Sequence, residues 1–93
     1  MSGLSGETEM PSIKHNGFSL RIRTNDHPPP HIHVVKAGGE LVFILGNKGR
    51  EPFLDRVLSP MKKTDARNAL EAVKANKKEM WKKWRATHER DKF

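Results

Sequence analysis

The sequence predicts an α+β fold, a small antiparallel β-meander of about three to four strands with two C-terminal helices packed on one face. Two turn signals, Asn16-Gly17 and Gly38-Gly39, each separate stretches of strand-like residues in the first half of the chain. The second half instead repeats its apolar residues with the period of an amphipathic helix. The 93 residues suffice for one small domain, and its core must be thin because only 34% of them are hydrophobic.

The first predicted hairpin has an apolar face and a basic face. Its strands are expected over residues 12–15 and 18–24, on either side of Asn16-Gly17. Successive strand residues point to opposite sides of a sheet, so alternate residues share a face. The second strand alternates three apolar residues with three polar ones, Phe18, Leu20 and Ile22 against Ser19, Arg21 and Arg23. Both arginines are therefore expected on the open face of the sheet.

The second predicted hairpin joins residues 31–37 to residues 40–45 through a pair of glycines. A turn made by these glycines places Ala37 opposite Glu40. A shift of one residue would exchange the two faces of the hairpin. The resulting core face holds Ile32, Val34, Phe43 and Leu45, and the open face holds His31, His33, Val35, Val42 and Ile44.

The chain then turns at residues 46–49, and residues 53–58 are expected to form either a short edge strand or an irregular segment. Ser59-Pro60 is typical of an N-cap followed by a proline in the first helical turn. The helical period that follows indicates one buried face, made of Ala66, Ala69, Leu70 and Val73.

A second helix is predicted at Asn76, because Glu79 three positions later completes a pattern that resembles a capping box. Its apolar face contains Met80, Trp81 and Trp84, and we expect both tryptophans to anchor the helix in the core. A single helix over residues 60–88 is the alternative, since the apolar period nearly continues through the asparagine.

We expect residues 1–9 to form a disordered N-terminal extension, residues 10–89 a single α+β domain, and residues 90–93 a frayed C-terminus. The absence of cysteine excludes disulfides and thiolate zinc sites, and it fits a cytoplasmic protein. No apolar run approaches the roughly 20 residues that a membrane span needs, so no membrane association is expected.

Basic residues gather near the C-terminus. Of the net charge of +7, residues 60–93 carry +6, with eleven Lys and Arg against five Asp and Glu. One basic element of this kind is typical of proteins that bind polyanions, although a solvated helix face has the same composition. The predicted nucleic-acid or phosphate contacts are Arg21 and Arg23 on the sheet and Lys77, Lys78, Lys82 and Lys83 on the last helix.

Three of the five histidines, His27, His31 and His33, lie within eleven residues around Pro28-Pro29-Pro30. The prolines favour a stiff, extended chain, and in the strand that follows His31 and His33 project from one face. Imidazoles titrate near neutral pH, so a pair of them can supply a general base and a general acid for cleavage of RNA. Arg21 and Arg23 on the same face would then neutralise the phosphate.

Two other interpretations of the histidines stay open. As metal ligands, His27, His31 and His33 would hold a divalent transition metal with an open position, as in catalytic zinc sites. As structural residues, His31 and His33 would fix the proline loop through backbone carbonyls, and the apolar neighbours Val35, Val42 and Ile44 would form a contact surface for a homodimer or a protein partner.

The motifs together resemble a known bacterial family. The strings Met10-Pro11-Ser12-Ile13, Gly17-Phe18 and His27-Pro28-Pro29-Pro30-His31-Ile32-His33-Val34, followed by an Ala- and Leu-containing helix and a Trp-bearing helix, resemble the bacterial domain of unknown function family 4160 over about residues 10–88. This chain has Asp26 where Glu is common in the family. The resemblance implies a small module coded in a toxin–antitoxin-like gene pair, with a cognate antitoxin or another small protein as partner and RNA as a target.

The sequence therefore predicts a toxin–antitoxin-type module that acts on or binds RNA through the His/Arg sheet face, without a cofactor. The alternatives are a non-enzymatic protein- or nucleic-acid-binding module and a His-ligated, metal-dependent hydrolase. The predicted catalytic residues are His27, His31 and His33, and whether the protein is a ribonuclease-like enzyme, a metal-dependent phosphoesterase or no enzyme stays open at this point.

Overall fold

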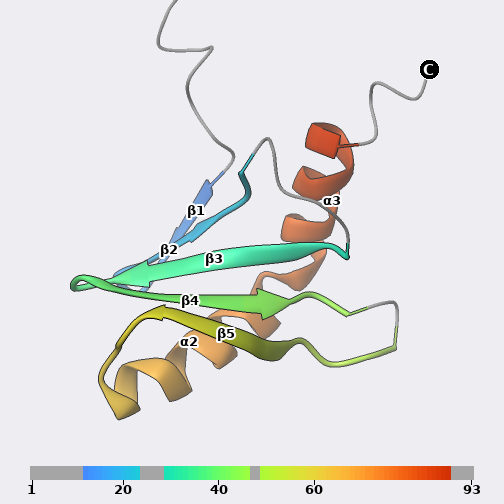
Figure 1. The fold of residues 1–93 in the computed structure, drawn as a ribbon. Coiled ribbons are helices and arrows are strands. Elements are labelled where there is room, and N and C mark those ends of the chain that lie inside the picture. The colour runs from blue at the N-terminus through green and yellow to red at the C-terminus, as the bar shows by residue number, and fades with distance from the viewer. Residues whose placement is uncertain (1–11, 24–28, 47–48, 89–93) are drawn as a thin grey trace, which may run out of the picture.

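The computed structural model describes residues 12–23, 29–46 and 49–88, and Figure 1 shows a sheet with two helices against one of its faces. The predicted N-terminal extension, the predicted frayed C-terminus and His27 lie outside the described residues. The strands are β1 (Ser12–His15), β2 (Phe18–Arg21), β3 (His31–Lys36), β4 (Gly39–Ile44) and β5 (Phe53–Ser59), and the helices are α2 (Lys63–Ala75) and α3 (Lys77–His88).

The described strands form one antiparallel sheet in the order β1-β2-β3-β4-β5, which is also their order in the chain. This arrangement confirms the α+β meander. The prediction of three to four strands was too low, because residues 53–59 form a paired edge strand. Strand β2 also ends at Arg21, three residues earlier than predicted.

The first hairpin has the predicted turn. Asn16 and Gly17 have φ angles of 50° and 86°. Positive φ at both central residues is what a two-residue type I′ turn requires, and Asn-Gly tolerates it best. Ile13 lies opposite Leu20 across this hairpin.

The second hairpin turns one residue earlier than predicted. Its central residues are Ala37 and Gly38, with φ angles of 50° and 84°, and Glu40 lies opposite Val35 instead of Ala37. The register therefore differs by two positions, which leaves every side chain on its predicted face.

Gly39 explains why the turn does not use both glycines. A Cβ at this position would lie 2.7 Å from the carbonyl oxygen of Pro60 and 2.8 Å from the Cβ of Met61. The segment that leads from β5 to α2 packs against the first residue of β4 at this contact, so the second glycine belongs to the strand and permits close packing.

The core lies between the sheet and the helices. All four residues predicted for the core face of the second hairpin are buried there, together with side chains from both helices. The cluster comprises Phe18, Leu20, Ile22, Ile32, Val34, Leu41, Phe43 and Leu45 from the sheet side and Ala69, Ala72, Val73, Met80 and Trp84 from the helices. Trp81 is partly buried against it.

Asn76 separates the two helices, as the sequence predicted. Its side chain closes α2, however, because Nδ2 donates to the carbonyl oxygen of Ala72 at 2.8 Å. The same amide nitrogen lies 3.1 Å from Nδ1 of His15, which ties the helix junction to the first hairpin. Helix α2 itself starts after Lys62, later than Ser59-Pro60 suggested, since Ser59 is the last residue of β5.

Candidate functional site

Arg21 and His33 lie directly opposite one another in the β2–β3 pair, on the side of the sheet that also carries Val42. The adjacency of these strands confirms that the arginine and the histidine share a face. The expectation that this face leaves the histidines open to solvent was wrong. His31 is 8% exposed and His33 is 4% exposed.

His33 belongs to a small charged cluster. Its Nδ1 donates to Oε2 of Glu40 at 2.9 Å, and Nη2 of Arg23 donates to the same oxygen at 2.7 Å. One carboxylate of β4 thus joins His33 of β3 to Arg23, two residues beyond the end of β2, by charge-assisted bonds, which are stronger than neutral ones. Nε2 of His33 is itself buried, so a substrate phosphate could reach it only after the structure opens.

The predicted register of the β3–β4 pair did not place Glu40 close enough to His33 for the two side chains to bond. With Ala37 opposite Glu40, the carboxylate would lie four residues from His33 along the strand. In the structure Glu40 lies opposite Val35, two residues from His33 on the same face. The alternation of apolar and polar residues sufficed to place Glu40 and His33 on the same face of the sheet. Only the position of the turn could have shown that the two side chains lie close enough to pair.

His31 lies at the start of β3 and holds the end of the proline loop. Its Nδ1 donates to the carbonyl oxygen of Pro29 at 2.8 Å, and the amide of Leu45 donates to the carbonyl oxygen of Pro30 at 3.0 Å. The imidazole also lies 5.5 Å from the ring of Trp84 and 5.6 Å from that of His33, measured between ring centres. These contacts are those expected of a structural histidine.

The predicted metal site is not evaluated by these contacts, because His27 lies outside the described residues. Within residues 12–23, 29–46 and 49–88, no group of three or more His, Cys, Asp or Glu side chains is arranged to hold a metal ion. A site formed by His27, His31 and His33 therefore stays a prediction.

A second candidate site is a groove on the helical side of the molecule, of about 750 Å³. We call it the basic groove, and its described lining residues are Gly49, Lys74, Ala75, Lys77, Lys78, Trp81, Lys82 and Arg85. Five of these side chains are cationic and none is acidic. The guanidinium of Arg85 lies over the indole ring of Trp81, 5.5 Å from its centre.

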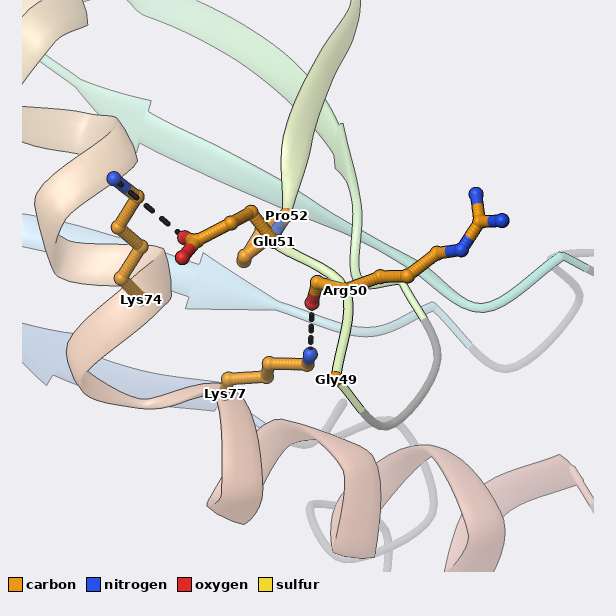
Figure 2. Close-up of a pocket in the computed structure, with 6 residues that line it drawn as sticks. All are labelled: Gly49, Arg50, Glu51, Pro52, Lys74 and Lys77. Atoms are coloured by element: carbon orange, nitrogen blue, oxygen red, sulfur yellow. Dashed lines mark hydrogen bonds and ion pairs between the residues drawn. The ribbon is translucent and has the colours of Figure 1, made fainter.

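The β4–β5 connection meets the basic groove at Gly49, and Figure 2 shows the neighbouring pocket, which this connection lines with Arg50, Glu51 and Pro52. Nε1 of Trp81 donates to the carbonyl oxygen of Gly46 at 2.8 Å. Lys77 donates from Nζ to the carbonyl oxygen of Arg50, while the side chain of Arg50 extends away from the helices (Figure 2). The ammonium of Lys74 lies 3.6 Å from a carboxylate oxygen of Glu51 (Figure 2). The connection is thus held against α3 at two backbone carbonyls.

The structure brings together three of the four predicted lysines, since Lys77, Lys78 and Lys82 line the groove and Lys83 is not among its lining residues. Arg21 and Arg23 belong to the sheet instead, where Nε of Arg21 donates to Oγ of Ser19 at 3.0 Å. Sequence reasoning missed Lys74, Trp81 and Arg85 as groove residues. Part of the signal was present, because positions 77, 78, 81, 82 and 85 follow the spacing of one face of the last helix, whereas Lys74 belongs to α2.

Exposed apolar side chains gather on β5. Phe53, Leu54, Val57 and Leu58 are each between 47% and 53% exposed. On the predicted dimer face, by contrast, Val42 is fully buried and Val35 and Ile44 are partly buried. A homodimer through Val35, Val42 and Ile44 stays a prediction. No described helix is long and apolar enough to cross a lipid bilayer.

The fold and its sites define a small basic α+β module, with a buried histidine–carboxylate cluster in the sheet and a cationic groove along the last helix. The chain belongs to the family described as a domain of unknown function (DUF4160), whose model matches residues 17–85. This match confirms the family that the sequence motifs resemble. No curated protein and no solved structure matched the chain.

Proposed function

We propose that this protein is an RNA-binding module that holds the phosphate backbone of its ligand in the basic groove. The observation that carries the proposal is the charge of the groove, where five cations and no acidic side chain are found among the described lining residues. A polyphosphate ligand gains most from such a surface, because each contact releases a condensed counterion from the nucleic acid.

The acidic neighbours of the groove do not neutralise it strongly. The ammonium of Lys74 lies 3.6 Å from Glu51 and 3.7 Å from Glu71, and that of Lys82 lies 3.9 Å from Glu79. Ion pairs this long between exposed side chains contribute about 0–1 kcal/mol. The lysines can therefore exchange these partners for phosphate oxygens at little cost.

Binding of a labelled single-stranded RNA by the full chain, measured by fluorescence anisotropy, tests the proposal. The variant K74Q/K78Q/K82Q removes three charges from the groove and keeps most of each aliphatic stem. The control K14Q/K62Q/K63Q removes the same charge from exposed side chains outside the groove. Selective loss of affinity in the groove variant supports the proposal, and equal loss in both variants contradicts it.

A second candidate function is cleavage of RNA by the sheet face, favoured by the cluster of His33, Glu40 and Arg23. A carboxylate that fixes Nδ1 of a histidine orients its other nitrogen for proton transfer. The variants H31A and H33A, shown to be folded by circular dichroism, should then lose cleavage of a fluorogenic RNA. Full cleavage by both folded variants would exclude the catalytic role.

We also propose, as the family resemblance implies, that the module works in a toxin–antitoxin-type pair with a small protein partner. The four exposed apolar side chains of the edge strand β5 support a protein contact, since exposed apolar surface often marks an interaction site. Induced expression of the chain alone should slow bacterial growth, and normal growth at high expression would contradict a toxic role.

A further inference from the structure

We infer that the basic groove takes RNA in single-stranded form, with one base stacked on the indole ring of Trp81. The inference rests on the proposed function and names the kind of RNA that fits the groove. It begins from the position of Trp81 between the groove and the core. The ring packs partly against the core and also lines the groove as its one aromatic side chain among the described residues.

The only polar group of the tryptophan side chain is already used inside the protein. Indole has a single donor, Nε1, and no acceptor. In the structure that donor is bonded to the carbonyl oxygen of Gly46 at 2.8 Å. Trp81 can therefore offer a ligand its ring surface but no hydrogen bond, and the same bond fixes the orientation of the ring before any ligand arrives.

Cations flank the ring in both directions along the helix. Lys77 and Lys78 precede Trp81 by one helical turn, while Lys82 and Arg85 follow it. A nucleotide with its base on the ring would thus have lysines within reach of the phosphates on either side. The guanidinium of Arg85 lies over the ring, 5.5 Å from its centre, so it must move aside when a base stacks there, and it can then pair with a phosphate or stack on the base.

The preference for single-stranded over duplex RNA follows from the ring surface that Trp81 offers. In a duplex the faces of the bases are covered by their neighbours, so a duplex could use the lysines but not the indole. An unpaired strand presents base faces, and stacking on an aromatic ring accepts any base. The remaining lining residues include Gly49 and Ala75, whose small size leaves room beside the ring.

Two substitutions of Trp81 in the full chain separate stacking from simple charge. W81F keeps an aromatic ring, whereas W81L keeps apolar bulk without a π surface. Binding is measured for a single-stranded RNA decanucleotide, an RNA duplex of the same length and a single-stranded DNA decanucleotide. For the single-stranded RNA, W81L should weaken binding about tenfold or more, and W81F about threefold or less. Duplex binding should change by less than about twofold in both variants.

Tryptophan fluorescence provides a second measurement. Single-stranded RNA should quench the emission of the native protein and should leave W81F unquenched, because the remaining Trp84 is 2% exposed in the core. Quenching that persists in W81F would overturn the inference, since it would place the effect at Trp84.

The possible failures are distinguishable. If no polynucleotide binds, the proposed function fails together with the inference. If single-stranded and duplex RNA bind equally and W81L changes neither, the proposed function stands and the inference fails. Equal loss of both ligands in W81L would also overturn it, because a loosened fold affects every ligand. Tighter binding of the DNA strand than of the RNA strand would overturn the assignment to RNA.

Discussion

His33 and Glu40 are joined across the β3–β4 pair by a bond of 2.9 Å from Nδ1 to Oε2, and the imidazole that donates it is 4% exposed. Arg23 shares the same carboxylate oxygen at 2.7 Å. Because the two donors depend on one acceptor, the loss of Glu40 would leave both without this partner inside or at the edge of the sheet.

Replacing Glu40 with glutamine should therefore destabilise the protein. Glutamine has a similar shape but no charge, and weakened bonds to two charged or buried donors cost about 1–3 kcal/mol. Urea unfolding followed by circular dichroism measures the change. E79Q is the matched control, because among the described residues Glu79 makes only an exposed ion pair of 3.9 Å, with Lys82, and it should shift stability by no more than about 0.5 kcal/mol. Equal effects of the two substitutions would show that the cluster is not stabilising.

Ala37 gives an opportunity to stabilise the protein. It has a φ of 50° in the second turn, a conformation that costs most L-residues roughly 1–2 kcal/mol and costs asparagine less. A37N should raise the free energy of unfolding by about 0.5–1 kcal/mol. The same exchange in exposed helix, A86N, should lower it by less than about 0.7 kcal/mol. A loss of stability in A37N would contradict the assigned turn.

Gly39 should not tolerate alanine. The added Cβ would meet the carbonyl oxygen of Pro60 at 2.7 Å and the Cα of Met61 at 2.9 Å, atoms that no change of rotamer can move. We expect G39A to lower the free energy of unfolding by about 1–3 kcal/mol. Shortening the neighbour in G39A/M61A should not restore it, since the Cα and Cβ remain. Recovery in the double variant would show that the clash involves only the outer part of the Met61 side chain.

Binding of RNA in the basic groove should depend steeply on salt. For single strands, the slope of log K against log salt is about −0.7 per phosphate contacted. Removing three groove cations in K74Q/K78Q/K82Q should therefore make the slope shallower by about 2. K14Q/K62Q/K63Q, which changes the net charge equally, should leave the slope unchanged. A native slope near zero would show that phosphate contacts do not drive binding.

The sequence predicted which face of the sheet each residue occupies better than it predicted which residues lie opposite one another on neighbouring strands. Strict alternation places Ile32 and Val34 on one side and His33 on the other wherever the turn lies, because a strand has a period of two. Which residues lie opposite one another depends on the turn. Gly38-Gly39 suggested the wrong one, since close packing at Pro60 and Met61 requires the second glycine in the strand. Contacts between distant segments leave no local pattern, and the bond from Glu40 to His33 was missed for that reason.

The basic groove, too, could be predicted from the sequence only in part. The basic charge of the last helix was evident from composition, and Trp84 was correctly placed in the core. Trp81 was expected in the core as well, but it is only partly buried, and the bond of its indole nitrogen to Gly46, which is distant in sequence, left no local pattern. Lys74 belongs to α2, whereas Lys78 and Arg85 belong to α3, so the groove is assembled from two helices. The break at Asn76 was predicted, but a local pattern does not show that residues on both sides of it line one groove.

The described strands lie in the sheet in the same order as in the chain, and this order has a consequence for how the protein folds. Each strand pairs with the next one along the chain, so every strand pairing closes a short loop and the sheet can grow during synthesis without waiting for distant segments. The helices emerge after all five described strands, and until they dock they do not cover the apolar side of the sheet. The interval between completion of β5 and docking of α2 and α3 is thus the stage at which nascent chains of this protein are most exposed to aggregation and most dependent on chaperones.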